Sequence, residues 1–274
     1  MRNSTLYKCV RYDLRVGLAG NILKYLLALF VFAFTAVMFF QSAHAVEASG
    51  SALDCLIYFY RGMQVYIPSG DTPFPVPVIW LMLQLLVSFL ILSYPTQDLE
   101  SYGMQFLVRT RKRGVWWTSK FIWNIVSVFL FYCIGIFTAF VFALLFGDAS
   151  FALHSKTAML VSEFGSSAGY AQTLAAVLIL PFLTSAAMAV FQMVLNFILR
   201  PVYSYIIVTA VYLASAYYNT PFLPGNYSML LRNEIALYGG VDTVFAVIAD
   251  CVILLISFLI GLAYFRHYDI LQKD

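Results

Sequence analysis

Residues 121–146 read FIWNIVSVFLFYCIGIFTAFVFALLF, and this stretch decides the fold class. It contains no charged residue and exceeds the roughly 20 apolar residues that a helix needs to cross the hydrocarbon of a bilayer. It is too long and too uniformly apolar to be an alternating strand of a membrane β-barrel. Because backbone polar groups in lipid must bond within their own segment, the stretch is predicted to be a transmembrane helix.

The composition of the whole chain agrees with this prediction. Of its 274 residues, 62% are hydrophobic and only 11% are charged, whereas soluble domains carry roughly 25% charged residues. A water-soluble fold of this length could not bury so much apolar surface. The sequence therefore predicts an all-α integral membrane protein with a single membrane domain.

Five further apolar runs have lengths close to that of a membrane span. The six predicted transmembrane helices cover residues 22–40, 76–95, 121–146, 172–199, 202–218 and 241–265. They divide the chain into an N-terminal cytoplasmic segment (1–21), a six-span domain (22–265) and a cytoplasmic tail (266–274). The fifth run is the shortest of the six.

The Lys and Arg residues predict the direction of the spans. All but three of the 16 basic residues fall on one side of the predicted membrane. The exceptions are Arg61, Lys156 and Arg232. Since cytoplasmic loops carry the excess of Lys and Arg, both chain ends are predicted to be cytoplasmic. Omitting the fifth span would reverse the sixth and break this agreement.

The segment before the first span has the period of an amphipathic helix. Its apolar residues are Tyr7, Val10, Leu14 and Leu18. Its basic residues are Lys8, Arg11 and Arg15. Such a pattern favours an interfacial helix that lies along the inner membrane surface. The alternative is a basic flank that only orients the first span.

The loop at residues 96–120 reads TQDLESYGMQFLVRTRKRGVWWTSK and mixes apolar with basic residues. A short helix between two glycines is predicted within it. An apolar patch among charges favours a docking surface for a soluble partner. Contact with anionic lipid is the alternative explanation of the charges. The candidate docking residues are Gly103, Met104, Phe106, Leu107, Arg109, Arg111, Lys112 and Arg113.

A few polar residues and one proline interrupt the predicted spans. Asp250 lies near the middle of the last span, where a charge is costly unless it is paired, hydrated or protonated. It is a candidate for a translocation path or for a structural hydrogen bond, with Gln192 or Asn196 as possible partners. Pro181 is a hinge candidate. The first outer loop (41–75) is long, and its apolar middle is expected on the outer membrane surface.

Neither a catalytic site nor a cofactor is predicted. The four cysteines and three histidines show no metal-ligand spacing, and no clustered acid or nucleophile pattern is present. No GxxxxGK[ST] phosphate loop occurs, so ATP binding by that motif is not expected.

Taken together, the chain resembles the membrane subunits of bacterial ABC-2-type transporters. The likeness depends on the N-terminal amphipathic segment, the stretch GMQFLVRTRKRGVWWTSKF (residues 103–121), the six spans and the ending FRHYDIL (residues 265–271). The resemblance implies an exporter-like permease in the bacterial cell membrane. It also implies a separate ABC ATPase subunit, bound by a coupling helix within residues 103–113, and a second, identical or different permease subunit. Membrane lipids are expected partners and nucleic acids are not.

Two other functions compete with transport. One is a non-transporting polytopic membrane protein, such as a sensor, an immunity factor or an assembly factor. The other is a membrane enzyme, which the absence of clustered His, Asp or Glu disfavours.

Overall fold

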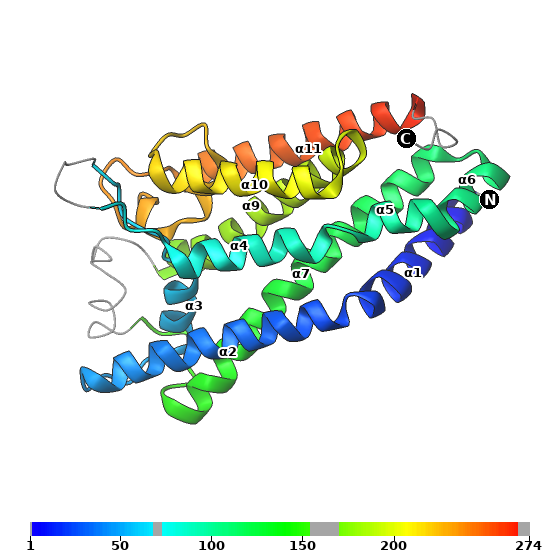
Figure 1. The fold of residues 1–274 in the computed structure, drawn as a ribbon. Helices are drawn as coiled ribbons and strands as arrows, with labels where there is room; N and C mark the ends of the chain where they lie inside the picture. The colour runs from blue at the N-terminus through cyan, green and yellow to red at the C-terminus, as the bar shows by residue number, and fades with distance from the viewer. Residues whose placement is uncertain (1, 68–72, 154–169, 268–274) are drawn as a thin grey trace.

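The computed structural model describes residues 2–67, 73–153 and 170–267, and these are predominantly helical (Figure 1). Two basic residues of the charge argument, Lys156 and Lys273, lie outside the described residues, as do residue 1 and the tail after residue 267. The α-helices are α1 (Arg2–Gly20), α2 (Ile22–Ala45), α3 (Ala52–Tyr60), α4 (Val78–Ile91), α5 (Tyr94–Asp98), α6 (Met104–Thr110), α7 (Arg113–Phe146), α9 (Tyr170–Ile198), α10 (Pro201–Tyr217) and α11 (Thr243–His267). A π-helical turn, η1 (Leu99–Gly103), joins α5 to α6, and two 3-10 turns, η2 (Pro224–Ser228) and η3 (Leu230–Arg232), precede α11.

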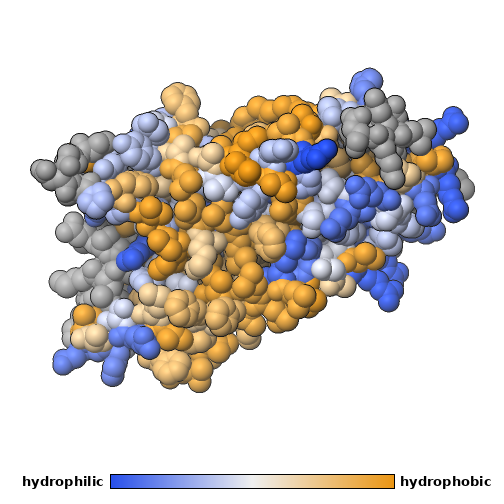
Figure 2. All heavy atoms as spheres, viewed as in Figure 1, coloured by the Kyte–Doolittle hydropathy of each residue, from blue (hydrophilic) through white to orange (hydrophobic). Residues whose placement is uncertain are grey.

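Five of these helical segments are long and apolar enough to cross a membrane, which confirms an all-α, multi-pass membrane protein. They are α2, the segment from α4 through α6, α7, α9 and α11. Figure 2 shows apolar residues over the middle of the visible face, while hydrophilic residues gather toward the two ends. At 17 residues, α10 measures about 26 Å, which is shorter than the roughly 30 Å hydrocarbon layer.

The predicted spans correspond to helices, but several boundaries differ. The first span extends beyond residue 40 to Ala45, and α7 begins at Arg113, well before the expected residue 121. The second predicted span, 76–95, is interrupted after Ile91. Among the five spanning segments, α9 is the most buried and α11 the least. The bundle is therefore built around α9.

The predicted first outer loop (41–75) contains a helix that is buried within the bundle, which corrects its expected place on the membrane surface. All nine residues of α3 are buried, and they pack in one core cluster with α2, α4, α7 and α9. Ser51 and Asp54 close the start of α3 by a capping box, in which each side chain accepts from the other's backbone N–H. Figure 1 shows α3 lying across the long helices at the end opposite α6.

A break between α4 and α5 explains two polar residues of α9, Gln192 and Asn196. The last carbonyls of a helix have no partner within it, and here side chains bind them. The amide of Gln192 donates to Ser88 O at 3.1 Å, and that of Asn196 donates to Leu92 O at 3.0 Å. Lys24 Nζ donates to the carbonyls of Phe89 and Leu90, at 3.0 and 3.3 Å. Gln192 and Asn196 thus stabilise this break and do not partner Asp250, contrary to the sequence-based expectation.

The N-terminal helix α1 packs along α7 as well as continuing toward α2 (Figure 1). Asp13 and Gly17 face the interior and are buried, whereas Tyr7, placed in the predicted apolar face, is 66% exposed. Leu14 and Leu18 are partly buried against the core. The face of α1 that packs against the bundle is therefore not the predicted apolar face. It includes Asp13, because Asp13 pairs with the buried Lys120 of α7.

Replacing Gln192 by Leu tests the role of α9 at the α4 break. The variant leaves Ser88 O without its side-chain donor, and the free energy of unfolding is expected to fall by about 0.5–2 kcal/mol. Thermal unfolding in detergent measures this change. The exposed Gln105→Leu change on α6 is the control, and equal stability of the two variants would contradict the assignment.

Candidate functional site

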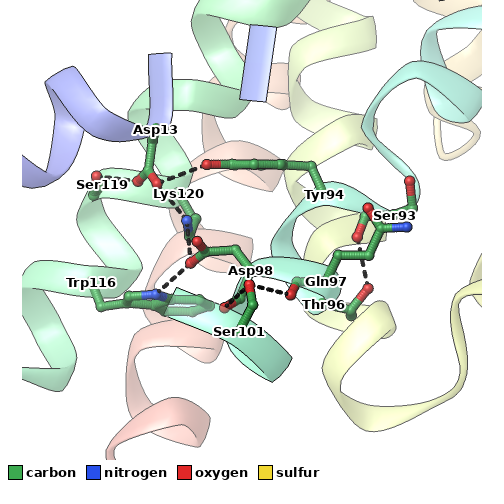
Figure 3. A network of polar contacts seen from close by, with 10 residues as sticks. All are labelled: Asp13, Ser93, Tyr94, Thr96, Gln97, Asp98, Ser101, Trp116, Ser119 and Lys120. Carbon is green, nitrogen blue, oxygen red and sulfur yellow. Dashed lines mark hydrogen bonds and ion pairs between the residues drawn. The ribbon is translucent and has the colours of Figure 1, made fainter. Parts of the chain in front are cut away.

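Three charged side chains meet in the interior where α1, α5 and α7 converge (Figure 3). Lys120 Nζ of α7 lies 2.5 Å from Asp13 Oδ1 of α1 and 2.6 Å from Asp98 Oδ2 of α5. Each of the three side chains is at most 5% exposed. Buried charges of this kind are found paired, because an isolated one is strongly destabilising. The ion pairs therefore fix both α1 and α5 to α7.

Neutral side chains donate further hydrogen bonds to both carboxylates. Asp13 accepts hydrogen bonds from the hydroxyl of Tyr94, at 3.0 Å, and from that of Ser119. Asp98 accepts one from the indole N–H of Trp116, also at 3.0 Å. Figure 3 shows these donors arranged around the two carboxylates. With most of their lone pairs bound, the carboxylates are held in one geometry.

The aromatic rings also contact the cation. Lys120 Nζ lies 4.7 Å from the ring centroid of Tyr94 and 5.1 Å from that of Trp116. These distances allow favourable cation–π attraction. We call this set of side chains the Lys120 cluster: Asp13, Tyr94, Asp98, Trp116, Ser119 and Lys120.

Two glycines give the Lys120 cluster the space it needs. A Cβ atom on Gly103 would lie 2.6 Å from Asp98 Oδ2 and 2.7 Å from Trp116 Nε1. A Cβ atom on Gly17 of α1 would clash with the indole of Trp123 on α7. Gly103 is itself buried, so its role is to allow the close approach of Asp98 and Trp116.

The pKa shifts of the acidic groups in and beside the cluster follow from their burial. Burial raises the pKa of the Asp13 carboxyl, and the opposing influences come from the Lys120 ammonium and the Ser119 hydroxyl. Burial, reinforced by the Asp13 charge, raises the pKa of the nearby Cys9 thiol to about 11, so this thiol stays protonated and unreactive at neutral pH. Within the described ranges, no group of His, Cys, Asp and Glu side chains could hold a metal ion.

The predicted docking residues are divided between the interior and the surface. Leu107 is buried, and Phe106 is partly buried, in an apolar cluster with Trp116 and Phe265. The apolar patch is therefore largely used in internal packing, and only Val108, 61% exposed, remains available. Met104 and Arg113 are partly buried, and Arg113 Nη1 donates to Arg266 O at 2.7 Å. The exposed basic residues are Arg109, Arg111 and Lys112.

Asp250 lies in a separate polar region of the bundle. Its side chain is fully buried, and its Oδ2 accepts from the hydroxyl of Thr184 at 2.6 Å. Its Oδ1 has no hydrogen-bond partner among the described residues. The partner of Asp250 is thus the hydroxyl of Thr184 on α9, about two helical turns before Gln192.

Gln84 of α4, which sequence reasoning missed, lies in the same part of the bundle. Its Oε1 accepts from Ser185 at 2.7 Å, and its Nε2 donates to Ser228 of η2 at 3.3 Å. The hydroxyl of Tyr132 lies 2.6 Å from Ser185 Oγ and donates to the carbonyl of Pro181 at 2.8 Å. The helix α9 passes through Pro181 without ending. A lone amide inside an apolar run was the signal that could have pointed to Gln84.

Replacing Lys120 by Met leaves two buried carboxylates without their cation. Removing one partner of a buried ion pair costs about 3–5 kcal/mol, so a loss of this size is expected in the free energy of unfolding. The exposed Lys112→Met variant, near the start of the same helix, is expected to change it by less than about 0.5 kcal/mol. Unfolding of the purified protein in detergent measures both.

A triple variant checks the origin of that loss. This variant combines Lys120→Met with Asp13→Asn and Asp98→Asn, so all three charges are removed together. It is expected to be more stable than Lys120→Met alone. If Lys120→Met and Lys112→Met had the same free energy of unfolding, the conclusion that the cluster holds the helices together would be wrong.

In the comparisons with known proteins, the chain matches one family. Residues 72–271 match the model of a family described as "Protein of unknown function (DUF2705)". Neither the curated proteins nor the solved structures gave a significant match. The resemblance to ABC-2-type transporters was therefore wrong, because no family of that class matches and a different family covers most of the chain. By this match, the chain belongs to the DUF2705 family.

Proposed function

We propose that the chain is the membrane-spanning subunit of a transport complex driven by a separate soluble ATPase, which binds at the α6 end. The Lys120 cluster is the observation that carries this proposal. It connects the segment leading into α6 with α1 and with α7, a helix of 34 residues. A displacement of α6 by a bound partner would therefore be transmitted along α7 through the membrane.

The proposal places the α6 end in the cytoplasm. This end holds the start of α1 and the end of α11, since Lys112 Nζ lies 3.3 Å from Thr5 Oγ1 and Arg113 binds Arg266 O. An excess of Lys and Arg is typical of the cytoplasmic side. Both ends of the chain are then cytoplasmic. This arrangement needs α10 as a sixth span, with its short length accommodated by local thinning of the bilayer.

The exposed part of the α6 region fits an acidic surface on the ATPase. Arg109, Arg111 and Lys112 are exposed beside Val108. Positive charges around a small apolar centre would steer and orient an acidic partner. The complex would contain a second permease subunit in the same bacterial cell membrane, and its cargo would be exported. ATP hydrolysis would belong to the partner, so the chain itself would not be an enzyme.

Charge reversal of these three residues tests the proposal. The chain is purified from its native membranes and the ATPase activity recovered with it is measured. In the combined variant Arg109→Glu, Arg111→Glu and Lys112→Glu, recovery is expected to fall by about tenfold or more, because like charges would face each other across the interface.

The control is Arg200→Glu, which reverses one exposed charge between α9 and α10 and is expected to leave recovery unchanged. Unchanged recovery in the triple variant would contradict docking at α6. Absence of any ATPase with the unaltered chain would favour the alternative, a non-transporting membrane protein that acts as a sensor, immunity factor or assembly factor.

A further inference from the structure

An apolar groove of about 500 Å³ runs along the outside of the bundle between α1–α2 and α7. Its volume lies within the range of small-molecule and cofactor sites. One wall carries Leu18, Ala19 and Ile22, and the other carries Leu130, Ile134 and Phe137. Since the groove lies on an outward face of a membrane protein, hydrocarbon chains are the molecules that reach it.

A row of positive charges precedes this groove along α1. Lys8, Arg11 and Arg15 are exposed on α1 at spacings of three and four residues. Continuing the same spacing leads to Leu18, Ala19 and Ile22, so the row and the groove wall share one face. The groove is thus lined by apolar residues, and the basic row continues from it along α1 toward the α6 end.

The charges of this row are not neutralised by other described residues. Lys8, Arg11 and Arg15 make no ion pair or hydrogen bond with other residues in the described ranges. The nearest acid along α1, Asp13, turns to the opposite side and binds Lys120 in the interior. The row therefore presents positive charge outward, where it complements an anion.

A second groove on the bundle shows what is specific to the first. It lies between α2, α4 and α10, has a similar volume of about 520 Å³, and is lined by Leu27, Met82 and Phe89 among others. The cation beside it, Lys24, already donates to two carbonyls and to Ser93 Oγ. Among the described residues, none that lines the second groove is basic, and Lys24 is already bound by the protein itself.

We propose that the groove between α1–α2 and α7 binds an anionic phospholipid. One acyl chain lies against Leu18, Ala19 and Ile22, and the phosphate is bound by Arg11 and Arg15. Guanidinium groups suit this role because their planar donors match phosphate oxygens. The proposal is independent of any partner ATPase, and it assigns the basic row of α1 to a defined lipid and not to the membrane surface in general.

Binding is measured on the full chain, purified in detergent and delipidated, by native mass spectrometry. The probes are phosphatidylglycerol and phosphatidylcholine with identical acyl chains, and glycerol 3-phosphate as the head group alone. Phosphatidylglycerol is expected to bind about tenfold more tightly than phosphatidylcholine, and glycerol 3-phosphate is expected not to be retained.

Two variants separate the head-group contact from the acyl-chain contact. Arg11→Gln with Arg15→Gln is expected to remove the preference for phosphatidylglycerol. Ala19→Trp fills the groove from an exposed position and is expected to weaken the binding of both lipids.

The matched controls are Arg200→Gln with Arg266→Gln, which removes the same charge at two exposed positions outside the basic row of α1, and Leu27→Trp, which obstructs the second groove. Both are expected to bind phosphatidylglycerol like the unaltered chain. Equal binding of the two lipids, or an equal loss in either control, would overturn the proposal. Retention of glycerol 3-phosphate alone would also overturn it, since the site would then be one for a soluble phosphate.

Discussion

The ion pairs of Lys120 with Asp13 and Asp98 are the interaction on which the organisation of the α6 end depends. They join three parts of the chain that are distant in sequence: the N-terminal helix, the segment after α4, and the long helix α7. Water would screen such pairs and make them weak. Here the side chains are almost fully buried, so separating any one of them would leave an uncompensated charge. The three segments that the cluster joins are therefore expected to move together.

The rest of the bundle follows from the demand that lipid places on backbone polar groups. A helix that breaks within an apolar environment must find donors for its free carbonyls. At the end of α4, these donors come from Gln192, Asn196 and Lys24. At the opposite end, Arg232 donates to the carbonyls of Ser215 and Ala216, at the end of α10. These four polar residues thus lie where a helix ends inside the bundle.

Hydropathy and length were sufficient to predict the class of the fold and the approximate position of the helices. They worked because lipid imposes one simple requirement on a spanning segment, a long apolar helix. They could not place α3. Its apolar residues fit a membrane surface as well as a packed interior, and burial among four other helices is a tertiary property. For the same reason, composition could not reveal that Phe106 and Leu107 of α6 pack inward.

The cluster itself was only partly visible in the sequence. Lys120 counted as one more cation of a basic loop, because its partner Asp13 is 107 positions away. A lone acid within a basic segment, as at Asp13, was the available signal. The family assignment from loose motifs was wrong for a related reason, since six spans, a basic loop and an amphipathic N-terminus meet general demands of membrane insertion.

Hydrogen exchange of backbone amides tests most directly whether the cluster couples α6 to α1 and α7. In the Lys120→Met variant, exchange is expected to accelerate together in α1 and in residues 94–110, while α9 stays protected as in the unaltered chain. Faster exchange confined to the first turns of α7, with α1 and α6 unchanged, would contradict the account.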